Sequence, residues 1–268
     1  MIPARFDYRR AGSVAEALDL LAANEDAKLL AGGHSLIPLL RLRFARPSML
    51  VDVGRLDDLR YVRDDGDTIA IGALTRHRDL GTSSLLLERC SLLAEAAGRI
   101  GDPQVRHRGT IGGSVAHGDP ASDLPTILLA LDADLVIQGA SGSRTVPAAA
   151  FFTGMFETAL GPAEMLTEIR VPAAQGTYVK YVRASRDWAT VGVAAAHLNG
   201  RVQVALTSMG ATPLRAAGVE EALAGGASPE EAAARAAEGT SPPSDVGGSA
   251  EYRQHLARVL VRRALERV

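Results

Sequence analysis

Two short segments place adjacent glycines beside hydroxyl side chains, a combination suited to binding phosphate. They are Ala31-Gly32-Gly33-His34-Ser35 and Thr110-Ile111-Gly112-Gly113-Ser114. Glycine permits backbone conformations in which N–H groups turn outward, and it lets a ligand approach the main chain closely. Successive N–H groups that point the same way bind anions, and serine hydroxyls add donors. One segment suits one phosphate, so the two together predict a pyrophosphate between two larger groups, as in a flavin dinucleotide.

Other phosphate-binding motifs are not found in the sequence. Neither G-x-G-x-x-G nor G-x-x-x-x-G-K-[ST] occurs, so a Rossmann dinucleotide site and a P-loop are both disfavoured. A single Gly-Gly pair is more typical of a structural turn. The functional interpretation therefore depends on the repetition of the pair, on the adjacent Ser35 and Ser114, and on the polar run that follows the second segment.

Polar residues near the glycine pairs each have more than one interpretation. Asp123 suits contacts with ribose hydroxyls or adenine, and it equally suits the N-cap of a helix that begins at Leu124. His34 and His117 are interpreted as polar loop residues, because no H-E-x-x-H, H-x-x-E-H or Cys/His cluster accompanies them. A hydrolytic triad of Ser114, His117 and Asp123 lacks a G-x-S-x-G turn, so a hydrolase is not favoured.

Three further residues are singled out by their type. Trp188 is the one tryptophan in the sequence; it suits either a core position or a cover over one face of a planar ring. Lys180 is either a surface lysine or a charge offered to a flavin carbonyl or phosphate. The single cysteine, Cys90, rules out an internal disulfide and a thiolate-ligated iron–sulfur cluster built from this chain alone. It lies in an apolar helical stretch and is expected in the core.

Composition excludes several classes of protein. The chain has 268 residues, 47% of them hydrophobic and 22% charged, which is ordinary for a soluble globular protein of one large or two modest domains. A formal charge of −2 gives no reason to expect nucleic acid or an anionic membrane as the partner. No apolar run approaches the roughly 20 residues of a membrane span, and the start lacks a signal-peptide pattern, so a cytoplasmic location is expected.

The first 173 residues alternate helices and strands that position the two glycine segments. A capping box at Ser13 starts a helix, which leads into a strand at 27–30 that ends in the first segment. Helices are expected at 75–80, 84–100 and 124–131, and strands at 48–53, 59–63, 68–72, 133–137, 144–146 and 165–171. The stretch 101–109 is expected to be irregular, and its Arg106 and Arg108 suit a phosphate, a partner protein or a solvated face.

The last third changes character after a weak linker near residue 173. A strand at 177–182 and a hairpin of 191–198 and 202–208 around Asn199-Gly200 predict three antiparallel strands. Helices follow, one starting with a capping box and proline at Ser228-Pro229 and a long amphipathic one over 250–267. Strands followed by helices predict an α+β C-terminal domain.

Taken together, these motifs resemble the FAD-binding medium subunit of molybdenum hydroxylases, the carbon monoxide dehydrogenase and xanthine dehydrogenase family. The resemblance covers essentially the whole chain. The segments that carry it are A-G-G-H-S-L-I-P from 31, T-I-G-G-S-V-A-H-G-D-P-A-S-D-L-P from 110, E-M-L-T-E-I-R-V-P from 164, K-Y-V-R-A-S-R-D-W-A from 180 and Y-R-Q-H-L-A-R-V-L-V-R-R-A-L from 252.

The resemblance implies an α+β fold. A two-subdomain FAD-binding domain of the vanillyl-alcohol-oxidase type is expected over 1–173, with subdomains of about 1–55 and 56–173. A C-terminal domain with a three-stranded antiparallel sheet and helices is expected over 174–268. Trp188 stands where many relatives carry a tyrosine over the isoalloxazine. The implied FAD-binding residues are Ala31, Gly32, Gly33, His34, Ser35, Leu36, Ile100, Thr110, Gly112, Gly113, Ser114, Asp123, Leu166, Lys180 and Trp188; no acid–base catalyst or metal ligand is expected.

In such complexes the substrate is oxidised at a molybdopterin in a large subunit, and electrons pass through 2Fe-2S clusters of a small subunit. With one cysteine, this chain is expected to be the flavin relay of a heterotrimer, passing electrons to an external acceptor such as a quinone or NAD. Two alternatives stay open: a free-standing FAD-dependent oxidoreductase acting on a small organic substrate, and a scaffold protein that has lost FAD. The substrate and the acceptor are not determined by the sequence.

Overall fold

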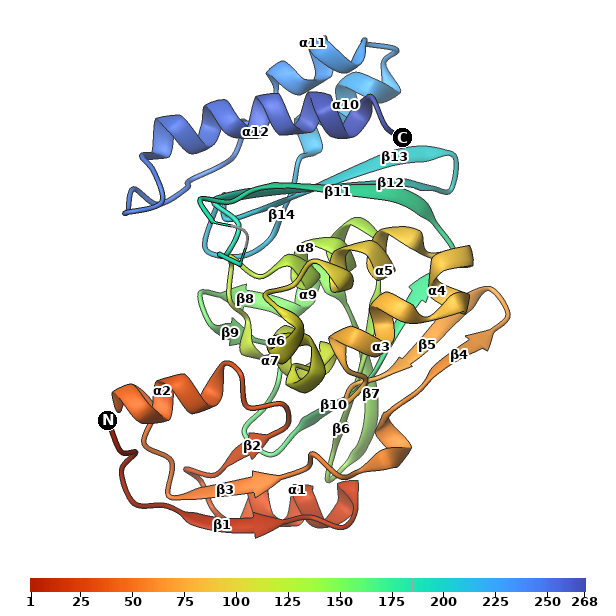
Figure 1. The fold of residues 1–268 in the computed structure, drawn as a ribbon. Coiled ribbons are helices and arrows are strands. Elements are labelled where there is room, and N and C mark those ends of the chain that lie inside the picture. The colour runs from red at the N-terminus through yellow and green to blue at the C-terminus, as the bar shows by residue number, and fades with distance from the viewer. Residues whose placement is uncertain (185) are drawn as a thin grey trace.

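A computed structural model describes residues 1–184 and 186–268, which form three larger sheets and one two-stranded sheet, with helices between and around them (Figure 1). The first sheet has three parallel strands in the order β1-β3-β2. Its elements are β1 (Asp7–Arg10), α1 (Val14–Ala23), β2 (Lys28–Leu30), α2 (Leu36–Leu42) and β3 (Met49–Asp52).

The start of α1 follows from its sequence. The Ser13 hydroxyl accepts from the N–H of Glu16 at 3.1 Å, whereas the Glu16 carboxylate accepts from the N–H of Gly12 at 2.7 Å. The predicted capping box is therefore closed one residue before the N-cap. Leu18 and Leu21 of this helix are buried with Val51 of β3 in one hydrophobic cluster, so burial of the apolar face stabilises the helix.

The middle of the molecule is a five-stranded antiparallel sheet in the order β4-β5-β10-β6-β7, packed against a group of short helices (Figure 1). Its strands are β4 (Val62–Asp65), β5 (Thr68–Gly72), β6 (Asp134–Gly139), β7 (Gly142–Pro147) and β10 (Met165–Pro172), and the segment also holds the 3-10 helix Asp57–Leu59 and a small hairpin of β8 (Phe152–Gly154) and β9 (Glu157–Thr158). The helices are α3 (His77–Thr82), α4 (Ser84–Arg89), α5 (Ser91–Gly98), α6 (Pro103–Arg108), α7 (Ile111–His117), α8 (Asp123–Ala130) and α9 (Ala148–Phe151).

The C-terminal region is a four-stranded antiparallel sheet with helices on its outer side. Its elements are β11 (Gln175–Tyr181), β12 (Val191–Leu198), β13 (Arg201–Thr207), β14 (Leu214–Arg215), α10 (Ala217–Ala224), α11 (Pro229–Ala234) and α12 (Ala250–Leu265). The three predicted strands are confirmed, and β14 adds two residues at the edge.

Strand β12 is buried on both faces. Val193 and Ala195 belong to the cluster that includes α12, whereas Ala194 and Ala196 belong to the central core beneath α5 and α8. A strand covered on both sides needs an unbroken apolar run instead of an alternating one, which explains the sequence V-G-V-A-A-A. The sheet thereby joins the C-terminal helices to the centre of the molecule (Figure 1).

Two expectations about the helices between residues 84 and 109 were wrong. The long helix over 84–100 is broken at Cys90, whose backbone leaves the helical region at φ −149°. The stretch 101–109, expected to be irregular, contains α6. The Asp102 carboxylate accepts there from the N–H of Val105 at 3.0 Å, and Pro103 occupies the first helical position. Aspartate at the N-cap followed by proline is a helix start signal that can be recognised in the sequence.

Over the described residues, no helix combines the length and apolar character that a membrane span requires.

Candidate functional site

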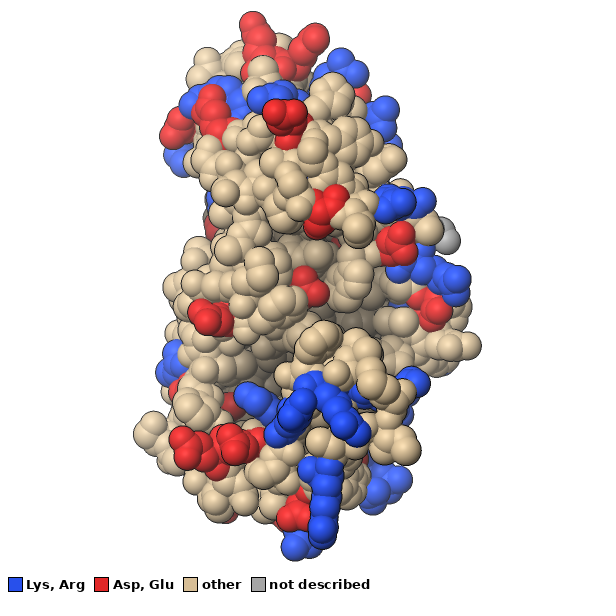
Figure 2. All heavy atoms as spheres, turned by 90° about the vertical axis from the view of Figure 1, so that its left-hand side faces the viewer, with Lys and Arg blue, Asp and Glu red and all other residues tan. Residues whose placement is uncertain are grey.

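The two glycine segments, nearly 80 residues apart in sequence, lie against each other in the wall of one large cleft. A Cβ added at Gly32 would lie 2.3 Å from the carbonyl oxygen of Arg108, and one added at Gly113 would lie 3.8 Å from Cβ of Ala31. The cleft measures about 1470 Å³, larger than the roughly 300–1,000 Å³ of a typical small-ligand site. Figure 2 shows the face of the molecule that is hollowed at mid-height, with basic side chains gathered below the hollow.

The first segment offers a row of backbone donors to this cleft. Gly33 has φ +79°, a conformation that favours glycine, and the chain then enters α2 at Leu36. Across the described residues, the N–H groups from Gly32 to Leu36 make no hydrogen bond to the protein. Neighbouring unpaired N–H groups before a helix are suited to an anion. Binding of a pyrophosphate by this segment stays a prediction.

The second segment has a different structure from the one expected. Gly112 and Gly113 lie in the first turn of α7, not in a loop. Their N–H groups are engaged by the carbonyl of Ala73 at 2.8 Å and by the hydroxyl of Thr110 at 3.2 Å. A Cβ at Gly112 would lie 2.5 Å from that of Ala73, so this glycine serves close packing. Gly113 is exposed on the cleft wall, and Ser114 provides a hydroxyl there.

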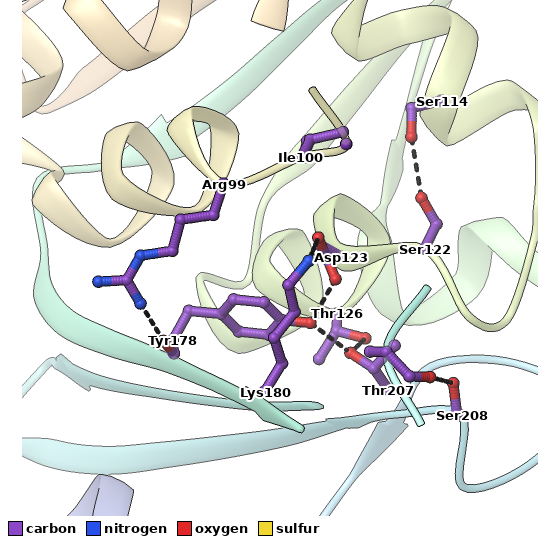
Figure 3. A network of polar contacts seen from close by, with 12 residues as sticks. Arg99, Ile100, Ser114, Ser122, Asp123, Thr126, Tyr178, Lys180, Thr207 and Ser208 are labelled. Carbon is purple, nitrogen blue, oxygen red and sulfur yellow. Dashed lines mark hydrogen bonds and ion pairs between the residues drawn. The ribbon is translucent and has the colours of Figure 1, made fainter. Parts of the chain in front are cut away.

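Asp123 is the centre of a polar network that joins the central helices to the C-terminal sheet (Figure 3). Its two carboxylate oxygens accept from the Tyr178 hydroxyl at 2.7 Å and from Lys180 Nζ at 2.6 Å. The Tyr178 hydroxyl also lies 3.2 Å from Thr207 Oγ1, which donates to Thr126 Oγ1 at 2.8 Å. Asp123 is 7% exposed, and both Asp123 and Lys180 line the cleft.

This network decides between the alternative interpretations given above for Asp123 and for Lys180. Ser122, not Asp123, is the N-cap of α8, so the capping alternative for Asp123 is wrong. The Lys180 side chain is 13% exposed and paired, so it is not a surface lysine. The Asp123 carboxylate retains lone pairs beyond the two it uses, and its contact with the adenosine part of a ligand stays a prediction.

The triad drawn from Ser114, His117 and Asp123 is not assembled. The Ser114 and Ser122 hydroxyls lie 2.9 Å apart, whereas the His117 ring packs on Phe156 at 5.1 Å between centroids. Burial lowers the pKa of His117. The structure therefore provides no serine–histidine–aspartate relay at this site.

The remaining predicted residues lie around the same cleft. Leu166 is buried and Ile100 half-buried in its wall. His34 is exposed, with Nε2 3.2 Å from the carbonyl oxygen of Gln104. Trp188 is 60% exposed at the cleft, so it is not a core residue and is free to cover a ligand.

Other residues with more than one reading have structural roles. Arg106 donates to the carbonyls of Ile100 at 2.9 Å and Gly101 at 3.3 Å, which fixes the turn before α6. Burial raises the pKa of the Cys90 thiol to about 11, in keeping with the expected core position. Within 1–184 and 186–268, no three His, Cys, Asp or Glu side chains are grouped to hold a metal ion.

Sequence reasoning missed two residues of the site. Tyr178 lies two positions before Lys180 on the same face of β11, and that spacing was the available signal. His77 begins α3 and lines the cleft while 4% exposed. Burial and the nearby positive groups His34, Arg76 and Arg106 lower its pKa to about 4. No motif in the sequence marks His77.

Comparison with known proteins identifies the family. Residues 4–174 match the profile of the FAD binding domain in molybdopterin dehydrogenase, and residues 176–268 match the CO dehydrogenase flavoprotein C-terminal domain. The chain is an FAD-binding medium subunit of the molybdenum-hydroxylase family. It is 46% identical to the carbon monoxide dehydrogenase medium chain of Hydrogenophaga pseudoflava, over 99% of this chain and 97% of that protein. It is 39% identical to the glyceraldehyde dehydrogenase medium chain of Sulfolobus acidocaldarius, over the full length of both.

A solved structure agrees with this assignment. Carbon monoxide dehydrogenase from Hydrogenophaga pseudoflava, in a form that lacks the Mo-pyranopterin moiety, superimposes with a TM-score of 0.95 at 45% identity, over 99% of this chain and 98% of that one. The medium subunit therefore has the family fold throughout and is part of an oxidoreductase. The cleft fits the family's cofactor, because the unpaired N–H groups from Gly32 to Leu36 suit its anionic pyrophosphate.

Proposed function

We propose that this subunit is the electron relay of a molybdenum hydroxylase complex, receiving electrons from the iron–sulfur clusters of a partner subunit and delivering them to an external acceptor. Two observations support the proposal together. Residues 4–174 match an FAD-binding domain, and the single cysteine, Cys90, is buried, so iron–sulfur clusters must come from another chain.

Bound FAD supplies the redox chemistry, and the protein supplies binding, orientation and charge. The backbone from Gly32 to Leu36 binds the pyrophosphate. Asp123 and Lys180 present a paired carboxylate and ammonium to the adenosine side or to the flavin. The hydroxyls of Thr110 and Ser114 add polar contacts, while Ile100, Leu166 and Trp188 provide apolar and aromatic surface to the ring systems.

The proposed partners are a large molybdopterin subunit and a small subunit with 2Fe-2S clusters, in a cytoplasmic heterotrimer, with a quinone or NAD as acceptor. Relatives that share the whole length are medium chains of enzymes named for carbon monoxide and for glyceraldehyde. This range is expected where the substrate pocket lies in another chain. We also propose the division into 1–173, with subdomains of about 1–55 and 56–173, and 174–268, which the limits of the two family profiles support.

A visible spectrum tests the proposal. The chain purified alone should show flavin absorbance without iron–sulfur absorbance, and purification from its own host should bring two further polypeptides together with iron–sulfur absorbance. Flavin in a chain that stays solitary in both preparations would favour the free-standing flavoenzyme instead. Absence of flavin from both would overturn the proposal.

A further inference from the structure

The loop that carries Trp188 connects β11 to β12, and we define the Trp188 loop as residues 182–184 and 186–190. Its base is closed by the N–H of Thr190, which donates to the carbonyl of Tyr181 at 2.9 Å. Arg186, Asp187 and Trp188 line the cleft from this loop. The position of the loop therefore determines what Trp188 can cover.

The end of the loop is held by Arg253, from the first turn of α12. Arg253 is 4% exposed, and its guanidinium donates to the carbonyl of Thr190 and, at 2.6 Å, to Oδ1 of Asp245. A Cβ at Gly247 would lie 2.8 Å from Nη2 of Arg253, so the chain before α12 is shaped around this group. Burying a charged group costs free energy unless acceptors surround it, and these two acceptors come from the loop and from the segment before α12.

Two more contacts join the Trp188 loop and the end of β11 to α12 and the segment before it. Arg183, near the start of the loop, donates from Nη1 to the carbonyl of Val246 at 2.5 Å. The Tyr181 and Tyr252 rings meet edge to face, 6.3 Å apart. On the other side of the cleft, the loop has an ion pair of Arg186 with Asp102 at 3.8 Å, and exposed pairs of this kind contribute little. The loop is thus held from α12 and the segment before it, and also by Ser208, whose hydroxyl donates to the carbonyl of Ala189 at 2.8 Å.

We propose that Arg253 is a positioning residue, which fixes the Trp188 loop at the cleft through the Thr190 carbonyl. The guanidinium suits this task because its planar fork reaches two acceptors in fixed directions, whereas a lysine ammonium is a single point charge on a flexible stem. The consequence for a bound flavin rests on the function proposed above. Fixation of the loop does not depend on that function, and it can be measured in protein without FAD.

Trp188 makes the test direct, because it is the one tryptophan of the chain. The experiment measures the decay of its fluorescence anisotropy in FAD-free protein and its quenching by flavin after FAD is added. The variants are Arg253→Lys and Arg183→Met, which weaken the attachment at opposite ends of the loop. Arg258→Lys is the control, since Arg258 lies on the exposed side of the same helix and contacts the carbonyl of Ala234 at 3.3 Å.

In FAD-free protein, both test variants should at least double the amplitude of the fast, nanosecond component, the timescale of loop motion, while Arg258→Lys keeps the wild-type decay. With FAD, quenching of Trp188 should fall at least twofold in both. An unchanged decay in folded Arg253→Lys overturns the proposal. Should that variant fail to fold by circular dichroism, Asp245→Ala, which removes the exposed acceptor that orients the Arg253 guanidinium, decides in its place. If the two test variants show the anisotropy response but the wild type binds no FAD, the proposed function is overturned and the loop assignment stands.

Discussion

Tyr178 and Asp123 meet where the C-terminal sheet packs on α8, with the phenol donating to the carboxylate at 2.7 Å. The contact needs space on the neighbouring strand, since a Cβ at Gly192 would lie 2.3 Å from the Tyr178 hydroxyl oxygen. Burial and the adjacent Asp123 charge raise the pKa of Tyr178 well above its usual value. The phenol is therefore held in its protonated form, in which it donates to Asp123.

Tyr178→Phe removes that donor and leaves Asp123 and Thr207 each short of one partner. The expected loss is about 1–3 kcal/mol of the free energy of unfolding, because the unsatisfied groups are buried. Urea denaturation measures it. The matched control is Tyr8→Phe, whose hydroxyl donates to Asp52 at 2.5 Å on the exposed surface, where about 1 kcal/mol or less is expected. Equal losses in the two variants would contradict the assignment of a buried network.

Lys180→Met leaves the Asp123 carboxylate in the cleft without its ammonium partner. The single variant should lose several kcal/mol of unfolding free energy, up to about 3–5 for a buried pair. Adding Asp123→Asn should restore part of that loss. A double-mutant cycle gives the coupling, expected at about 0.5–3 kcal/mol for residues in contact. Additive losses would mean that the 2.6 Å contact contributes nothing in solution.

Gly33→Ala separates backbone strain from ligand binding when compared with Gly226→Ala. Both glycines have positive φ, +79° and +85°, so each variant should lose about 1–2 kcal/mol of stability. At Gly226 a Cβ meets open space, whereas at Gly33, which lines the cleft, it would lie 2.7 Å from Cδ1 of Ile37. Only Gly33→Ala should weaken FAD binding, by tenfold or more in an equilibrium titration. Similar FAD affinities in the two variants would remove the first segment from the pyrophosphate site.

His77 predicts a specific dependence of stability on pH. Its pKa is lowered from 6.5 to about 4 in the folded protein, first by burial and then by nearby positive charge. Below pH 6.5 the unfolded chain binds the proton more readily, so the contribution to stability falls as pH drops toward 4 and is lost below it. The total is about 3 kcal/mol.

Urea denaturation between pH 7 and pH 4 tests this dependence in the wild type and in His77→Gln. The wild type should lose about 3 kcal/mol more than the variant over that range. His255→Gln, at an exposed position, controls for the substitution itself. Parallel curves for the wild type and His77→Gln would show that the imidazole is not held neutral.

Local sequence signals predicted much of the fold. The capping box at Ser228 forms as expected, with Glu231 bonded back to the N-cap. The hairpin at Asn199-Gly200 has positive φ at both residues, +51° and +74°, as its turn type requires. The free N–H groups around Gly33 also follow from local glycine chemistry. In each case a few neighbouring residues determine the conformation.

Features that depend on distant partners were not predictable in the same way. Glycine disfavours helix interiors, yet Gly112 and Gly113 lie in the first turn of α7. At Gly112, Ala73 packs where a side chain would stand. Tyr178 becomes part of the site only because β11 lies across α8. These outcomes are set by packing between elements, which overrides local propensity.

The burial of Cys90 makes this subunit a convenient single-thiol protein. With its pKa raised to about 11, the native thiol should be slow to alkylate, because the reactive species is the thiolate. Its labelling rate then reports the opening of the helical layer at α4 and α5 under native conditions. A cysteine introduced at an exposed position would carry a spectroscopic label at one chosen place, with the natural residue left in position.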